Sequence, residues 1–76
     1  MKAIVNIRIN RSAGKPTATL TKIQKVAGVT SADLLYGKWD AVATVEGAET
    51  DVSGAVLKIA SLPAVSDTET LIVVTV

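Results

Sequence analysis

Cysteine, histidine and phenylalanine are absent from this chain of 76 residues. Without cysteine or histidine there is no disulfide bond, no thiolate nucleophile, no imidazole-based catalytic triad and no metal site built on those ligands. Tyr36 and Trp39 are the only aromatic residues, which are too few for the base-stacking platforms of single-strand nucleic-acid binders. Asp33, Asp67 and Glu69 are spread over two predicted strands and do not form a general acid–base pair. We therefore predict no catalytic residue, no metal site and no cofactor.

Net charge and long apolar runs are also scarce. Eight Lys and Arg residues nearly balance seven Asp and Glu residues, and the net charge is +1, so no general attraction to nucleic acid or to an anionic membrane is expected. The densest apolar run, residues 71–74, is far shorter than the roughly 20 residues of a membrane-spanning helix. Asn6 and Arg8 interrupt the N-terminal apolar segment, which therefore does not resemble a signal peptide. The expected localisation is cytoplasmic.

The length predicts a single domain over residues 1–76. A domain of this size buries only about 60% of its unfolded surface. With no disulfide and no metal to add stability, oligomerisation is the expected additional source.

Two similar halves become visible when the sequence is laid over itself with an offset of 36 residues, which aligns Lys22 with Lys58 and Val29 with Val65. At this offset the alternating apolar residues of segments 5–9 and 41–45 coincide. Such alternation indicates a half-buried strand, and apolar residues at helical spacing follow in each half. We therefore predict a duplicated strand–helix–strand unit.

The predicted element order is βαββαβ. Strands are expected at residues 2–10, 29–36, 39–46 and 66–75. One helix is expected from Pro16 to just before Gly28, and a second from about residue 50 to about residue 62, ahead of Pro63.

Two connections carry specific local predictions. Gly37 and Lys38 are expected to form a two-residue hairpin of the Gly-X kind. Thr50 or Asp51 is the expected N-cap of the second helix, because both side chains can accept a hydrogen bond from the first turn.

Right-handed crossovers between these elements give a ferredoxin-like α+β fold, in which a four-stranded antiparallel sheet carries both helices on one face. The residues expected to face the helices are Val5, Ile7, Ile9, Ala41, Ala43, Val45, Leu71 and Val73. The residues expected on the other face are Ile4, Asn6, Arg8, Val42, Thr44, Thr68, Thr70, Ile72 and Val74. The centre of this second face is too apolar for a solvated sheet, so a second copy is expected to cover it in a dimeric, barrel-like α/β assembly.

Several segments, taken in order, resemble a known family. They are Ala3-Ile4-Val5, Val26-Ala27-Gly28-Val29, the hairpin Tyr36-Gly37-Lys38-Trp39-Asp40 with the alternating strand Ala41 to Val45 after it, Leu62-Pro63-Ala64-Val65, and the last strand from Thr68 to Val74. With this pattern, the chain resembles the ligand-binding and oligomerisation (RAM) domain of the Lrp/AsnC transcription regulators over nearly its whole length. One departure is Ala64, where the family usually has glycine.

The resemblance implies an assembly and a ligand. Family members pair through their sheets into dimers, dimers associate into tetramers, octamers or larger rings, and small amino acids bind between dimers. Full-length members carry an N-terminal helix-turn-helix domain. Because the first predicted strand starts at Lys2, the chain looks like a stand-alone effector domain with no DNA-binding element, and a full-length regulator is a further expected partner.

The resemblance also implies site residues. Those expected to line the ligand are Gly37, Lys38, Asp40, Thr68 and Thr70. The residues expected at subunit interfaces are Tyr36, Trp39, Val42, Ile72 and Val74.

The chemistry of these residue types suits an amino acid, although each has an ordinary structural explanation too. Asp40 can accept hydrogen bonds from an ammonium group, while free backbone N–H groups near Gly37 and Thr hydroxyls can donate to a carboxylate. Equally, Gly37 can be a hairpin glycine, Asp40 can bond neighbouring backbone N–H groups, and threonines are common in strands. Arg8, Arg11 and Lys15 are expected to be solvated.

Three functions stay open on the sequence alone. The favoured one is an amino-acid-binding and oligomerisation module linked to transcriptional regulation. The second is an assembly-only module that forms homo- or hetero-oligomers without a ligand. The third and least favoured is a small ferredoxin-like barrel enzyme, because such enzymes are usually longer and commonly use a pocket histidine.

Overall fold

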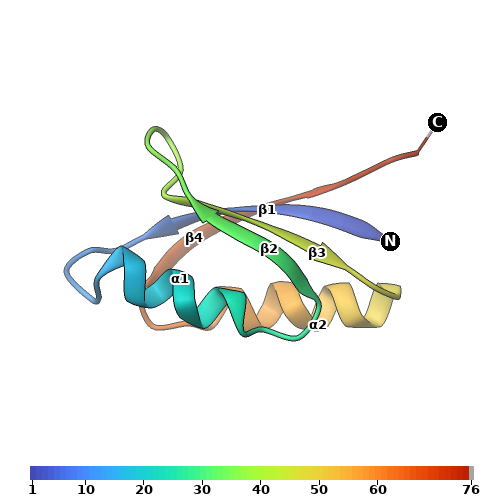
Figure 1. The fold of residues 1–76 in the computed structure, drawn as a ribbon, viewed down its shortest axis with the longest axis horizontal. Coiled ribbons are helices and arrows are strands. Elements are labelled where there is room, and N and C mark those ends of the chain that lie inside the picture. The colour runs from blue at the N-terminus through green and yellow to red at the C-terminus, as the bar shows by residue number, and fades with distance from the viewer. Residues whose placement is uncertain (76) are drawn as a thin grey trace.

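A four-stranded antiparallel sheet, covered on one face by two helices, forms the fold (Figure 1). The computed structural model describes residues 1–75. The elements are β1 (Lys2–Ile9), α1 (Pro16–Gln24), β2 (Val29–Leu34), β3 (Ala41–Glu46), α2 (Glu49–Ala60) and β4 (Val65–Ile72). The predicted βαββαβ order and the ferredoxin-like α+β class are confirmed.

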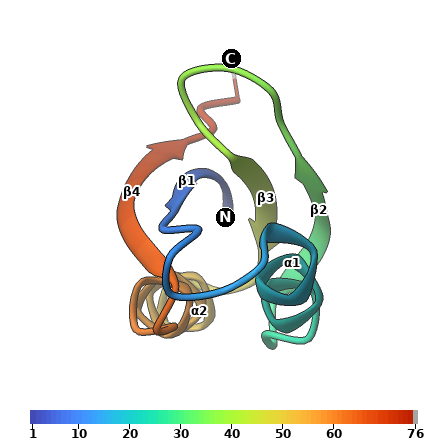
Figure 2. The same cartoon turned by 90° about the vertical axis from the view of Figure 1, so that its left-hand side faces the viewer.

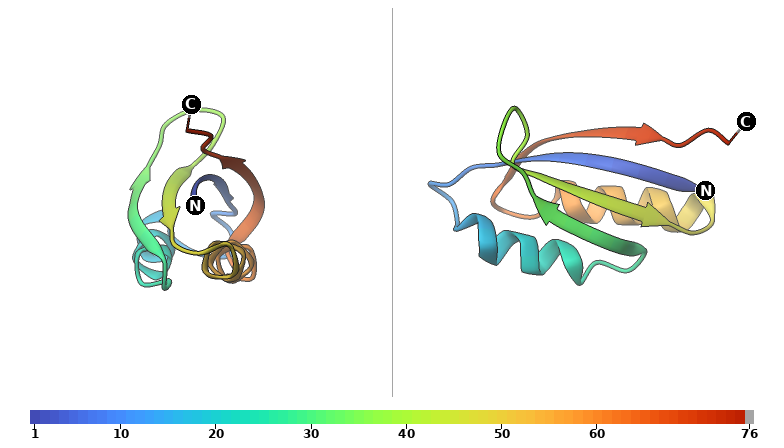
Figure 3. Two further views of the ribbon diagram at one scale, coloured as in Figure 1. Left: turned by 90° about the vertical axis from the view of Figure 1, so that its right-hand side faces the viewer. Right: turned by 45° about the horizontal axis from the view of Figure 1, so that its top comes forward.

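The two halves of the repeat interleave in the sheet. The strand order is β2-β3-β1-β4, so the first strand of each half lies at the centre and the second at an edge (Figure 3). Both helices lie side by side beneath the same face, as the end-on view shows (Figure 2). We call the uncovered side of the sheet the open face.

The core lies between the central strands and the helices. Every residue predicted to face the helices from β1 and β3 is buried, namely Val5, Ile7, Ile9, Ala41, Ala43 and Val45. The register pairs Val5 with Ala43, so their side chains share the helix-facing side of the sheet. Ile23 of α1 and Ile59 of α2 are fully buried against this layer, so the hydrophobic effect fixes which side of the sheet the helices cover.

The first helix begins at Pro16, as predicted, and ends at Gln24. The turn that follows carries Val26, which still packs against the core, and Gly28 with a φ of 97°. This conformation favours glycine, and a Cβ there would lie 3.5 Å from Val45. Within residues 1–75 no helix is long and apolar enough to cross a membrane.

The second helix starts two or three residues earlier than the predicted N-cap implies. Its N-cap is Ala48 and its first helical residue is Glu49, so the prediction of Thr50 or Asp51 as the N-cap is wrong. Alanine has no side-chain acceptor for the first turn. Instead, the Asp51 carboxylate lies in that turn and accepts a hydrogen bond from the Ala48 N–H at 3.2 Å, where it also interacts favourably with the helix dipole.

The side chains of β4 alternate in the opposite sense to the prediction. Thr68 pairs with Ile7 and Thr70 with Val5, and directly opposed residues of an antiparallel pair share a face. Both threonines therefore lie on the helix side of the sheet. Leu71, which pairs with Ile4, lies on the open face, where it is half exposed.

A β-bulge at Ser66 causes this reversal. Ile9 pairs with Val65 whereas Arg8 pairs with Asp67, so Ser66 is an extra residue. One inserted residue moves every later side chain of the strand to the other face. The predicted faces of Leu71, Val73, Thr68, Thr70 and Ile72 are therefore wrong. A hydrogen bond between Asn6 Nδ2 and Glu69 Oε1 at 3.3 Å places Glu69 on the open face, consistent with this register.

The connection between β2 and β3 is longer than the predicted two-residue turn. β2 ends at Leu34 and β3 begins at Ala41, and the N–H of Leu35 donates to the carbonyl of Asp40 at 2.8 Å. Residues 35–40 therefore form one loop, which we call the hairpin loop. Gly37 has a φ of 156°, whereas the first central residue of a type II′ turn needs about +60°.

Candidate functional site

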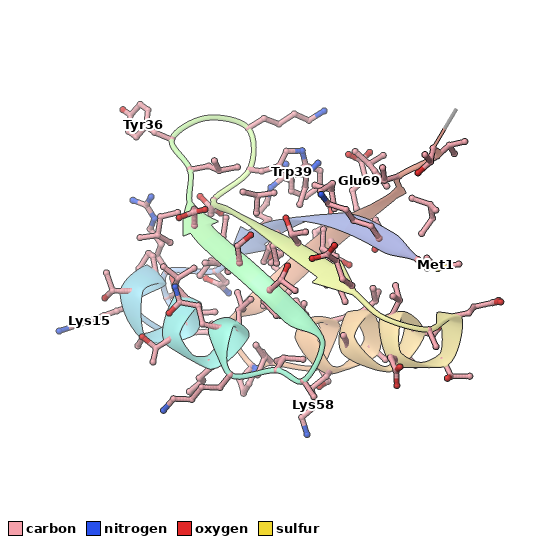
Figure 4. The ribbon with its side chains drawn as sticks, turned by 45° about the vertical axis from the view of Figure 1, so that its right-hand side comes forward. Met1, Lys15, Tyr36, Trp39, Lys58 and Glu69 are labelled. Atoms are coloured by element: carbon pink, nitrogen blue, oxygen red, sulfur yellow. The ribbon has the colours of Figure 1, made fainter. Side chains whose placement is uncertain are left out.

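The hairpin loop stands at one end of the sheet, on the side away from the helices (Figure 1). Tyr36 lies at its tip, fully exposed, and points away from the domain (Figure 4). The loop contains three of the five residues predicted to bind a ligand, namely Gly37, Lys38 and Asp40. It is therefore the centre of the candidate site.

Asp40 is fixed by β1. Its backbone N–H donates to the Ile7 carbonyl at 2.9 Å, and its carboxylate oxygen Oδ2 accepts the Ile9 N–H at 2.7 Å. In a regular sheet, a backbone carbonyl of the neighbouring strand would accept the hydrogen bond from the Ile9 N–H. Because β3 begins only at Ala41, the Asp40 carboxylate accepts this bond instead. The Asp40 carboxylate thus bonds a backbone N–H, but the partner is Ile9 of β1 and not a residue close to it in sequence, and the bond is charge-assisted.

The second oxygen of Asp40 remains open. Its Oδ1 accepts no hydrogen bond from residues 1–75, and no buried unpaired side-chain atom occurs among them, so Oδ1 reaches solvent. The nearest cation is Arg11, whose Nη2 lies 4.0 Å from Oδ1. Asp40 therefore combines a fixed position with a free acceptor.

Arg8 holds the hairpin loop over the open face. Its guanidinium carbon lies 5.0 Å from the centre of the Trp39 ring, and its Nη2 donates to the Lys38 carbonyl at 3.3 Å. Trp39 lies on the open side of the sheet (Figure 4) and is half-buried. Arg8 is exposed, as predicted, but it also makes a cation–π contact with Trp39 and a hydrogen bond to the loop.

The loop also presents backbone donors. Across the part of the chain that the structure describes, the N–H groups of residues 36–39 donate no hydrogen bond. Consecutive free N–H groups in a turn form a concave site for anions, including a carboxylate. Nothing lies within 4 Å of the position that a Cβ would take at Gly37, so the space beside this residue is open.

Thr68 and Thr70 do not join the hairpin loop within one chain. They lie on the helix side of β4, whereas the loop rises from the other side of the sheet. Thr68 is half-buried and Thr70 is exposed. A site that includes all five predicted residues would need the threonines of a neighbouring copy.

The open face carries an apolar cluster. Ile4 and Val42 are half-buried at its centre, and the half-exposed side chains of Leu71 and Val73 extend it toward β4. We call Ile4, Val42, Leu71 and Val73 the open-face cluster. Leu71 and Val73 belong to it because of the bulge, a feature that the alternating pattern did not reveal.

The other predicted interface residues are spread more widely. Ile72 pairs with Ala3 and so lies on the helix side, 51% exposed. Val74 follows the end of β4 and is 78% exposed. Their role as interface residues stays a prediction.

A separate groove of about 790 Å³ lies between the two helices. Lys22, Lys25 and Lys58 line it together with Glu46 and Asp51. None of the residues predicted to bind a ligand reaches it, and its charges are of both signs. The residues described hold no group of three Asp and Glu side chains placed to bind a metal ion. We assign no ligand to this groove.

Comparisons with known proteins agree with this fold. The model of the Lrp/AsnC ligand binding domain matches residues 2–76. The crystal structure of FFRP-DM1 is similar with a TM-score of 0.84 and 25% identity, over 96% of this chain and 97% of that one. TTHA0845 from Thermus thermophilus is similar with a TM-score of 0.81 and 27% identity, over 99% of this chain and 94% of that one.

A longer relative shows the same domain as one part of its chain. The structure of E. coli AsnC is similar with a TM-score of 0.80 and 28% identity, and the match covers 97% of this chain but 50% of AsnC. No curated protein sequence matches the chain. The family match over residues 2–76 shows that this chain belongs to the Lrp/AsnC ligand-binding domain family, a family of regulatory effector-binding modules.

Proposed function

We propose that this chain binds a small amino acid at the hairpin loop and works as an oligomer linked to transcriptional regulation. The observation that carries the proposal is the state of Asp40. One carboxylate oxygen is anchored to the Ile9 N–H at 2.7 Å, and the other faces solvent beside a loop with free N–H groups. In this proposal the chain is not an enzyme and acts in the cytoplasm.

The two poles of an amino acid match the two kinds of group at the loop. Its ammonium group needs a carboxylate acceptor, which Oδ1 of Asp40 offers, and such a bond is charge-assisted. Its carboxylate needs donors, which the free N–H groups of residues 36–39 offer. Lys38 is exposed in the same loop and adds positive charge.

Oligomerisation is the second part of the proposal. The open-face cluster is apolar and half-exposed, and pairing with the same face of a second copy would remove it from water. Thr68 and Thr70 of another copy would then complete the ligand site between dimers. An amino acid at such a site would shift the assembly only as far as it binds one oligomer better than another.

The assembly-only function remains the second candidate because of a specific observation. Asp40 already has a structural partner in Ile9, and the open-face cluster would favour pairing without any ligand. Under this alternative, a full-length Lrp/AsnC regulator is the expected partner in mixed oligomers.

A thermal-shift screen of the purified chain against the twenty amino acids tests the proposal. A ligand that binds only the folded protein, present at 100 times its Kd, adds about 2.7 kcal/mol of stability, which is a large shift in a domain of 76 residues. We expect a shift with one chemical group of amino acids. If none of the twenty shifts the transition at millimolar concentration, the ligand-binding function is wrong and the assembly-only function replaces it.

A further inference from the structure

We propose that Arg11 binds the ligand's carboxylate, so that Arg11 and Asp40 together select molecules with an ammonium and a carboxylate group on the same carbon. The inference rests on the proposed function and narrows its ligand to free α-amino acids. It assigns a binding role to a residue that the sequence alone predicts to be solvated.

The geometry of the pair is the first argument. Arg11 Nη2 lies 4.0 Å from Asp40 Oδ1, which is too long for a hydrogen bond. The Arg11 side chain is 72% exposed, and that of Asp40 is 23% exposed. The two opposite charges therefore lie next to each other without being joined, and both can be reached from solvent.

The different mobility of the two side chains is the second argument. Asp40 is anchored through Oδ2 to Ile9, so the direction of Oδ1 is set by the sheet. Arg11 follows β1 in an exposed turn, and its long side chain can adjust. An exposed pair of this kind contributes little to stability by itself, so a ligand can take its place at little cost.

The chemistry of an α-amino acid completes the arrangement. Its ammonium group would donate to Oδ1 of Asp40, and its carboxylate would accept two N–H bonds from the planar guanidinium of Arg11. Both charges of the open pair would then have a partner of opposite sign. An amine without a carboxylate, or a carboxylic acid without an amine, would leave one of the two charges without its partner.

The neighbouring cations do not offer the same arrangement. Arg8 is engaged with the Trp39 ring and the Lys38 carbonyl. Lys15 belongs to the same turn as Arg11, but its side chain points away from the domain (Figure 4). Within residues 1–75, Arg11 and Asp40 form the one ion pair within 4.0 Å.

The experiment compares wild type with Arg11→Gln, Arg11→Lys and the control Lys15→Gln, which removes one positive charge from the same turn. Each protein is titrated calorimetrically with the amino acid that gives the largest thermal shift, and with the α-carboxamide of that amino acid. Wild type should bind the acid at least about tenfold more tightly than the amide, because only the acid forms a charge-assisted bidentate pair.

Arg11→Gln should weaken binding of the acid about tenfold and leave binding of the amide nearly unchanged, so that the preference between the two disappears. Arg11→Lys should keep part of the preference for the acid, because lysine retains the positive charge but cannot form the two parallel hydrogen bonds of a guanidinium. Lys15→Gln should behave as wild type.

The outcomes separate the two proposals. If wild type binds the acid and Arg11→Gln still prefers the acid to the amide as strongly, Arg11 has no such role, while the proposed function stands. If wild type binds none of the twenty amino acids, both proposals fall. Because Arg11 is exposed and lies outside the core, the variants should unfold at the wild-type temperature. If Arg11→Gln unfolds at a lower temperature than wild type, Arg11→Lys replaces it in the test. If Arg11→Lys prefers the acid to the amide as strongly as wild type does, Arg11 does not bind the ligand's carboxylate through its guanidinium.

Discussion

Asp40→Asn is expected to weaken amino-acid binding about 10- to 100-fold while the free energy of unfolding falls by only about 1 kcal/mol, because the bond to the Ile9 N–H becomes neutral. The amide oxygen of asparagine can still accept the Ile9 N–H, which Asp40 Oδ2 accepts at 2.7 Å. Its NH₂ group would then take the place of Oδ1 and meet the ligand's ammonium, donor against donor. A hydrogen bond to a charged group contributes about 1.5–3 kcal/mol, and 1.4 kcal/mol corresponds to a factor of ten. Calorimetric titration and urea unfolding measure the two quantities.

Asp40→Ala separates the structural role of this residue from its binding role. Alanine leaves the Ile9 N–H, which is part-buried, without its charged acceptor, so this variant should lose about 1–3 kcal/mol of stability as well as binding. Glu49→Gln removes one negative charge from an exposed position of α2 and is the control. It should leave binding unchanged and lower stability only slightly, because Glu49 lies in the first turn of that helix. Asp40→Asn with wild-type affinity would remove Asp40 from the ligand site and leave it with only its structural bond.

Leu71→Asp is expected to convert the proposed dimer into folded monomers. Leu71 lies on the open face opposite Ile4 and is 50% exposed in the single chain, so an aspartate there stays solvated in the monomer. In a dimer that pairs open faces, the same carboxylate would be buried without a partner, which costs several kcal/mol. We expect the dimer dissociation constant to rise at least about 100-fold, as measured by analytical ultracentrifugation over a range of concentrations.

The matched control for this variant is Leu57→Asp. Leu57 is an exposed leucine of α2, on the side of the domain that carries the helices, and its substitution should leave the dimer intact. A dimeric Leu71→Asp protein would show that the open face is not the interface. A Leu71→Asp protein that fails to fold would instead mean that Leu71 faces the helices, contrary to the pairing of Leu71 with Ile4.

The central part of the fold could be predicted because it is repeated and local. In β1 and β3 the alternation is uninterrupted, and Val5 and Ala41 occupy corresponding places in the two halves. An amphipathic helix follows in each half, and Pro16 marks the start of the first one. Hydrophobic periodicity of this kind determines which side is buried before any long-range contact is known.

The face of β4 could not be predicted by the same argument. The sequence of this strand alternates as a regular strand does, and the extra residue, Ser66, carries no glycine or proline signal. The bulge is visible only in the pairing with β1. The length of the hairpin loop could not be predicted for a related reason. Asp40 ends the loop because its N–H donates to the Ile7 carbonyl and its carboxylate accepts the Ile9 N–H. These bonds join residues about thirty positions apart in the sequence.

The candidate site shows the same division between local and long-range information. Gly37, Lys38 and Asp40 lie together because they are neighbours in one loop, and that part of the prediction needed no tertiary structure. The contacts of Arg8 with Trp39, and the approach of Arg11 to Asp40, join the end of β1 to the hairpin loop. Scattered cations in a sequence give no sign of such pairings, which arise only from the antiparallel arrangement of β1 and β3.

Native mass spectrometry of the wild-type chain, with and without the twenty amino acids, tests the central claim most directly because it counts chains and ligands together. We expect dimers or larger assemblies of even chain number, and amino-acid adducts on the assemblies rather than on monomers, since Thr68 and Thr70 would complete the site from another copy. A change in the distribution of assemblies should accompany the adducts. Monomers alone, or assemblies that carry no adduct and keep the same distribution at saturating amino acid, would contradict the claim that this chain is an oligomeric amino-acid-binding module.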